Sequence, residues 1–69
     1  MWTPLHVASK QGFVEIVEYL LINGAGINDL TEDGYSPLHY AAQFGNLNVT
    51  KFLVEHGATI EETKEKLFI

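Results

Sequence analysis

Ser36-Pro37-Leu38-His39-Tyr40-Ala41-Ala42 is the stretch that decides the fold of this 69-residue chain. Ser36 is a favourable residue just before a helix, because its hydroxyl can accept a hydrogen bond from a free amide of the first turn. Pro37 then lies at the first helical position, where proline loses no hydrogen bond and its fixed φ suits a helix. The stretch therefore predicts a helix that begins at residue 37 and ends near Gly45.

The same pattern occurs 33 residues earlier, as Thr3-Pro4-Leu5-His6-Val7-Ala8-Ser9. The offset persists beyond this stretch. The further matches are Gly12 with Gly45, Leu20 with Leu53, Gly24-Ala25 with Gly57-Ala58, and Ile27 with Ile60. A fixed period in this range indicates a repeat architecture, in which one structural unit is used more than once.

Each copy predicts two helices. In the first copy, a helix from Pro4 to about Gln11 ends at Gly12, and a second helix runs from about Val14 to Asn23. The apolar residues of the second helix recur at helical spacing, so we expect them to form one buried stripe. They are Phe13, Ile16, Val17, Leu20 and Leu21.

The second copy repeats the plan. We expect Asn46 to cap a helix from about Leu47 to His56, which Gly57 ends. Within that helix, the Thr50 hydroxyl can donate to a carbonyl one turn earlier. After Ile60 the pattern fades, because residues 61–66 are charged and residues 67–69 are apolar.

The segment between the two copies has no helical period. Thr31-Glu32-Asp33-Gly34 fits a β-turn with glycine at its last position. We therefore expect residues 27–35 to form an extended, solvent-facing finger. Asn23-Gly24 could form a hairpin turn. The helical stripe that precedes it favours a helix end instead.

The composition excludes several classes of protein. The hydrophobic fraction of 46% is that of a globular chain, and without cysteine no disulfide or thiol chemistry is available. No apolar run approaches the ~20 residues of a membrane span, and the N-terminus lacks the features of a signal peptide. A net charge of −5 opposes binding to nucleic acid. We expect an intracellular protein, cytoplasmic or nuclear.

These motifs resemble the ankyrin repeat, whose pattern joins a β-turn finger, T-P-L-H-x-A-A, a glycine, a second helix with V-x-x-L-L, and Gly-Ala. The resemblance implies an all-α fold, an ankyrin-type helical solenoid of two helix-turn-helix repeats with a connecting β-turn finger. We expect a single domain over residues 1–69, with repeat one at about 1–33, repeat two at about 34–66, and a C-terminal tail at 61–69. Ser9, Gly26 and Thr59 depart from the pattern. Met1 replaces its glycine, which suggests a fragment of a longer array.

The resemblance implies that the chain binds another protein or peptide through its concave face of finger and inner helices, and that it is not an enzyme. The alternative is a structural spacer or a capping segment of a longer array. We expect partner-binding residues at Trp2, Lys10, Gln11, Glu32, Asp33, Tyr35, Gln43 and Phe44. Aromatic residues at the centre and acids at the finger tip suit a partner that is apolar in the middle and basic toward that tip. The aromatic residues could instead pack against a neighbouring finger.

Two units also leave two open apolar end faces, so we expect marginal stability or self-association through these faces, with Leu67, Phe68 and Ile69 partly covering one of them.

Other chemistry finds little support in the sequence. Ser36 and His39 lack a third group to form a catalytic triad, and the resemblance gives the histidine a backbone hydrogen bond between repeats. His6, His39 and His56 are too widely spaced for one metal ion. Gly24-Ala25-Gly26 follows a helix rather than a strand, which argues against a dinucleotide loop. We expect no cofactor and no metal. Leu20 and Asn28 match an asparaginyl hydroxylation pattern of the family, but Gly26 replaces its acid, and we favour a turn role for Asn28.

Overall fold

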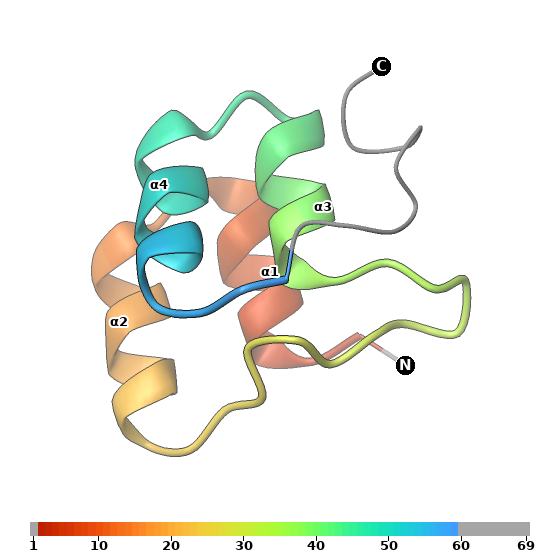
Figure 1. Ribbon diagram of the computed structural model, residues 1–69, viewed down its shortest axis with the longest axis horizontal. Helices are drawn as coiled ribbons and strands as arrows, with labels where there is room; N and C mark the ends of the chain where they lie inside the picture. The colour runs from red at the N-terminus through yellow and green to blue at the C-terminus, as the bar shows by residue number, and fades with distance from the viewer. Residues whose placement is uncertain (1, 60–69) are drawn as a thin grey trace.

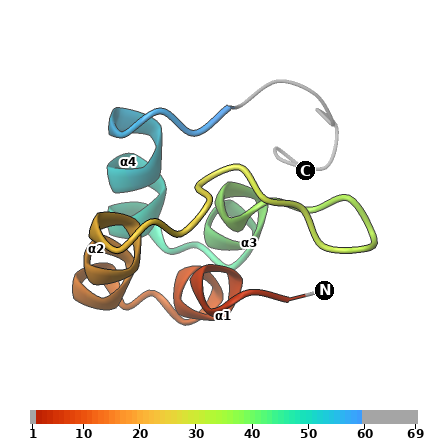
Figure 2. The ribbon, with the colours of Figure 1, turned by 90° about the horizontal axis from the view of Figure 1, so that it is seen from below.

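The computed structural model describes residues 2–59, and four helices account for most of them. They are α1 (Pro4–Gln11), α2 (Val14–Ile22), α3 (Pro37–Gln43) and α4 (Leu47–Glu55). Figures 1 and 2 show two layers, with α1 beside α3 and α2 beside α4. The described residues contain no strand, and the predicted all-α class is confirmed. The expected tail, including Leu67, Phe68 and Ile69, lies outside the described residues.

Both inner helices begin as the sequence predicts. The side chains of Thr3 and Ser36 accept hydrogen bonds from the backbone amides of His6 and His39, and a proline follows each cap. Each histidine ring also accepts from the backbone amide of its cap residue, which closes a reciprocal capping box. Gly12 ends α1 with a φ of 84°, a left-handed conformation that glycine adopts without steric cost.

The segment between α2 and α3 forms the expected finger. Ala25 donates to the Leu20 carbonyl at 3.0 Å, so the chain leaves α2 through a helix-ending turn and not through a hairpin. At the finger tip, the Gly34 amide donates to the Thr31 carbonyl at 2.9 Å, which confirms the β-turn. Figure 1 shows the finger (residues 27–35) projecting away from the four helices.

The core lies between the two helix pairs. Its buried apolar side chains come from all four helices and from the turn after α4. They are Leu5, Ala8, Val17, Leu38, Ala41, Val49, Leu53 and Ala58. Burial of such side chains is the main favourable term in the folding of a chain this small.

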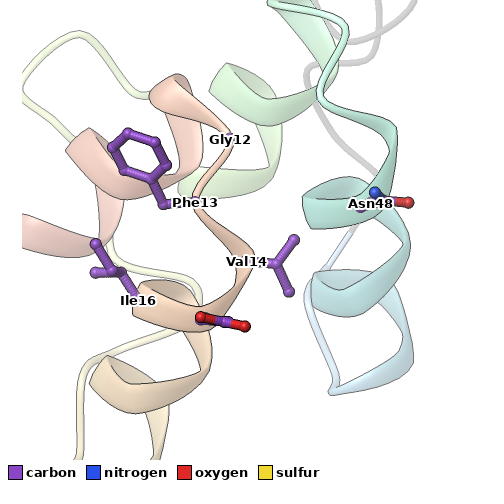
Figure 3. A pocket seen from close by; sticks show the side chains of 6 residues that line it. Gly12, Phe13, Val14, Ile16 and Asn48 are labelled. Carbon is purple, nitrogen blue, oxygen red and sulfur yellow. The ribbon is translucent and has the colours of Figure 1, made fainter.

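The predicted buried stripe of α2 is only partly correct. Val17 is fully buried, but Phe13 and Ile16 are about half exposed, at 51% and 48%. Figure 3 shows why, because the side chains of Phe13 and Ile16 project to the opposite side from Val14, which points toward α4. Only one flank of α2 has a neighbouring helix pair, and helical spacing alone does not reveal which flank that is.

Two side chains link the helix pairs. One is in α1, and the other is in the turn between α3 and α4. The His6 Nε2 atom lies 3.0 Å from the Tyr35 carbonyl, to which it donates. The Asn46 side-chain amide donates to the carbonyls of Ser9 and Lys10 at 2.8 and 2.7 Å. The prediction that Asn46 caps its own helix is therefore wrong, because its side chain satisfies the free carbonyls at the end of α1 instead. Within α4, the expected Thr50 bond to the Asn46 carbonyl is present at 2.9 Å.

The hydroxyl of Ser9 is buried and has no hydrogen-bond partner. An unsatisfied buried hydroxyl destabilises the folded state. Ser9→Ala should therefore raise the free energy of unfolding by about 1 kcal/mol, measured by urea denaturation. The matched control is Ser36→Ala, which removes a hydroxyl that caps α3 and should lower stability by about 1 kcal/mol. Equal signs for the two variants would contradict this assignment.

Candidate functional site

Aromatic side chains from both helix pairs meet along α1, α3 and the finger. We call Trp2, Tyr35, Tyr40 and Phe44, together with Lys10, the aromatic cluster. The rings of Trp2 and Tyr40 lie 4.4 Å apart, and Tyr35 meets Tyr40 edge to face at 5.6 Å. The chain thus gathers residues that are distant in sequence into one continuous surface.

Lys10 joins Trp2 to Phe44 within this cluster. Its Nζ atom lies 5.6 Å from the centre of the Trp2 ring and 5.2 Å from the centre of the Phe44 ring. Both distances are within the range of a cation–π interaction. Trp2 remains 45% exposed and Phe44 52% exposed, so both rings present apolar surface to solvent.

The remaining candidate residues lie around the cluster or apart from it. Glu32 and Asp33 are exposed at the tip of the finger, and Gln43 is exposed beside Phe44. Tyr35 is half-buried, with its ring edge to face against His39 as well as Tyr40. Gln11 lines a hollow on the flank of α1 and α2.

Tyr40 is the member of the cluster that the sequence analysis missed. It is only 8% exposed, and its ring packs against the Trp2 ring at a centroid distance of 4.4 Å. The signal available in the sequence was its place between His39 and Ala41, where the first copy has the smaller Val7. The larger Tyr40 ring meets the rings of Trp2 and His6.

His6 and His39 make hydrogen bonds that stabilise the fold. The His6 ring donates through Nε2 to a carbonyl, so Nδ1 is the acceptor for the Thr3 amide at 3.2 Å. Burial lowers the pKa of His6 below its usual value, while the hydrogen bond to the Tyr35 carbonyl acts in the opposite direction. The hydrogen bond between repeats that the resemblance implies is present at His6, and His39 Nδ1 accepts from the Ser36 amide at 2.9 Å. The corresponding bond of His39 to a following repeat stays a prediction.

Two further expectations concern the absence of a metal site and the role of Asn28. Within residues 2–59, no three His, Cys, Asp or Glu side chains lie close enough together to hold a metal ion. The Asn28 side-chain oxygen accepts from the Thr59 amide at 2.8 Å, so Asn28 ties the base of the finger to the turn after α4. That bond gives Asn28 a structural role.

A separate hollow of about 470 Å³ lies between the first turns of α2 and α4 (Figure 3). Its lining runs from Gly12 to Ile16 on one side and includes Asn48 on the other. It holds one carboxylate, Glu15, and lacks a second titratable or nucleophilic group. This lining offers no catalytic chemistry.

The sequence model of a repeat family, described as ankyrin repeats (3 copies), matches residues 1–64. The chain belongs to the ankyrin repeat family. Ankyrin repeats are generally non-enzymatic modules of protein–protein interaction. The two capping boxes and the connecting finger described above are the ankyrin motifs of this chain.

The structure also resembles the crystal structure of the human ASB11 ankyrin repeat domain, with a TM-score of 0.81 and 34% sequence identity. The match covers 84% of this chain and 26% of that domain, so this chain spans about a quarter of its length. A search of curated protein sequences found no match. Among the described residues, none of the ankyrin helices is long and apolar enough to cross a membrane.

Proposed function

We propose that this ankyrin unit binds a protein or peptide partner through the aromatic cluster and the finger tip, without catalysis of its own. The observation that carries the proposal is the arrangement of Trp2 and Phe44, two half-exposed rings held on either side of the Lys10 ammonium. Interfaces are enriched in aromatic anchors near their centre. Rings already held in place lose little conformational freedom on binding.

The charges around the cluster support a partner with basic residues. Glu32 and Asp33 carry negative charge at the finger tip, and the whole chain has a net charge of −5. The partner proposed is therefore apolar where it meets the rings and basic where it approaches the tip. The negative charge of Glu32 and Asp33 would attract the basic residues of the partner toward the finger tip. Such a partner, and an intracellular site of action, remain our proposals.

The alternative function is a spacer or a cap within a longer array. Tyr35 and Tyr40 favour it in part, because both rings pack against the chain itself. A spacer, however, has no use for Trp2 and Phe44 rings that are about half exposed. The two functions therefore predict different results when these two rings are removed. A binding module should lose affinity for its partner, and a spacer should not.

The experiment compares binding of the chain with binding of a Trp2→Ala, Phe44→Ala variant. Proteins retained from a cell extract by the immobilised chain are identified, and the affinity of the leading one is then measured with purified components. Removing both rings should weaken that affinity by at least ~1 kcal/mol, about fivefold. Circular dichroism establishes that the variant is folded. A folded variant with full affinity would support the spacer.

Two controls locate the effect. Tyr19→Ala removes an aromatic ring that is 65% exposed on α2, outside the cluster, and should leave binding unchanged. Glu32→Gln should slow association and reduce its dependence on salt, with a smaller effect on dissociation. An equal loss of affinity in Tyr19→Ala would show that binding follows general surface apolarity and not the aromatic cluster.

A further inference from the structure

The turn that ends α2 contains the only asparagine of the chain that is followed by glycine, Asn23-Gly24. Both residues are exposed, and Figure 1 shows the chain leaving α2 at an outer corner of the molecule. Asparagine is a thermolabile residue, because the nitrogen of the next peptide bond can attack its side-chain amide. A following glycine has no side chain to hinder that approach. The turn therefore has the chemistry of a modification site.

Hydrogen bonds hold the reacting groups apart while this turn is closed. The Asn23 side-chain amide donates to the Tyr19 carbonyl at 2.8 Å, and the Gly24 amide donates to the Leu21 carbonyl at 3.1 Å. The attacking nitrogen is thus occupied, and the group that it would attack is held against the preceding turn of α2. Both bonds lie in the exposed last turn of a helix, where local opening requires less free energy than unfolding of the core.

The second copy has the same turn without the reactive side chain. His56-Gly57 is equivalent to Asn23-Gly24 by the 33-residue offset. The His56 Nδ1 atom lies 2.8 Å from the Phe52 carbonyl one turn earlier, as the amide of Asn23 does from its own carbonyl in the first copy. The turn therefore forms with either residue, but histidine has no amide to lose.

We propose that Asn23 is a site of spontaneous deamidation, reached through opening of the last turn of α2. The Gly24 nitrogen bonds to the side-chain carbonyl carbon of Asn23, the bond from this carbon to the side-chain nitrogen breaks, and ammonia leaves with the proton of the Gly24 amide. The product is a cyclic imide. Water then opens either carbonyl–nitrogen bond of the imide, which leaves aspartate or isoaspartate at residue 23. Water is the only co-reactant.

Both products weaken the end of α2. A carboxylate only accepts hydrogen bonds, so aspartate loses the bond to the Tyr19 carbonyl. It also places negative charge at the negative end of the helix dipole, in a chain whose net charge is already −5. Isoaspartate in addition inserts a methylene group into the backbone, ahead of the Gly24 and Ala25 amides that bond carbonyls of α2. Ala25 packs against the core, so the change extends beyond the turn.

Asp33-Gly34 at the finger tip can form the same cyclic imide with loss of water. An ionised carboxylate is a poorer electrophile than an amide, because it already carries negative charge, so this reaction should be slower. Its product also has the mass of the starting residue. A gain in mass therefore reports on an amide side chain and not on Asp33. This proposal does not depend on the partner proposed for the aromatic cluster.

The test incubates the intact chain at mildly acidic and mildly alkaline pH and locates each conversion of amide to acid by mass spectrometry of proteolytic peptides. Asn28, Asn46 and Asn48 are internal controls, because a residue with a side chain follows each of them. Asn23 should convert first, and faster at the higher pH, where more of the attacking nitrogen is ionised. Equal conversion at all four positions, or none at Asn23 while the urea-unfolded chain converts fully, would overturn the proposal.

Urea at concentrations below the unfolding midpoint tests the role of the turn. Opening of one turn exposes little surface, so the rate of conversion should change little with urea until the chain unfolds. It should then rise, because no hydrogen bond protects the amide in the unfolded chain. A rate that follows the unfolded fraction at every urea concentration would show that global unfolding is required and would overturn the opening of this turn as the route.

Two variants connect the reaction to stability. Asn23→His copies the equivalent turn of the second copy, so it should fold, gain no mass at this position and keep its urea midpoint during incubation, while that of the natural sequence falls. Asn23→Asp reproduces one product and should lower the folding equilibrium constant about two- to fivefold. The purified isoaspartate form should lower it further. An equal fall in midpoint for Asn23→His and the natural sequence would contradict Asn23 as the cause.

Discussion

Leu53→Ala is expected to lower the free energy of unfolding by about 2–5 kcal/mol, because it removes a fully buried side chain and leaves a cavity in the core. A single core of this size rarely supplies more than about 3–5 kcal/mol. The variant should therefore be largely unfolded at room temperature. Circular dichroism in water and urea denaturation measure both the loss of helix and the change in stability.

Leu47→Ala is the matched control for this prediction. Leu47 lies in the same helix, undergoes the same chemical change and is 77% exposed. Its replacement should change stability by no more than about 0.5 kcal/mol. If both leucine variants lost the same stability, burial in the core would not explain the effect, because Leu47 is exposed.

His6→Ala is expected to lower the free energy of unfolding by about 1–3 kcal/mol. The imidazole is fully buried, and both of its nitrogens are used, one toward Thr3 and the other toward the Tyr35 carbonyl. Alanine leaves these groups without their partner. His56→Ala is the control, because His56 is exposed and its ring contacts Phe52 within the second helix pair, through a hydrogen bond to the Phe52 carbonyl and by stacking on the Phe52 ring. A stability loss confined to His6→Ala would support a structural role for the buried imidazole, and equal losses would contradict it.

The same residue predicts a dependence of stability on pH. Burial lowers the pKa of His6 in the folded state below its ordinary value of 6.5, so the unfolded state binds the proton more tightly. This group therefore leaves stability unaffected well above pH 6.5 and reduces it as the pH falls from 6.5 toward the lower folded value. In His6→Gln this part of the acid sensitivity should disappear. Urea midpoints of both proteins across this range provide the measurement, and parallel curves would contradict it.

Local signals in the sequence account for the parts of the fold that were predicted correctly. The caps at Thr3 and Ser36, the glycine after α1 and the β-turn at the finger tip all depend on residues within four positions of one another. The 33-residue offset then placed the second helix pair. Such interactions repeat wherever the same residues occur, so the pattern is sufficient to predict them.

Contacts between the helix pairs were the part that the sequence could not provide. Asn46 is an ordinary helix-capping residue by type, yet its side chain bonds carbonyls of another helix. Phe13 and Ile16 have the spacing of buried residues but lie on the flank without a neighbour. Within the candidate site, the position of Lys10 between two rings arises only when both helix pairs are stacked.

The second helix pair holds α1 at both ends, and this has a consequence for synthesis. The start of α1 depends on the carbonyl of Tyr35, which lies 29 residues after His6. Its end depends on Asn46, which lies 37 residues after Ser9. A short isolated helix is marginal in water. As the chain leaves the ribosome, residues 4–11 emerge before both of these partners, so α1 should become ordered only after Tyr35 and Asn46 have been made.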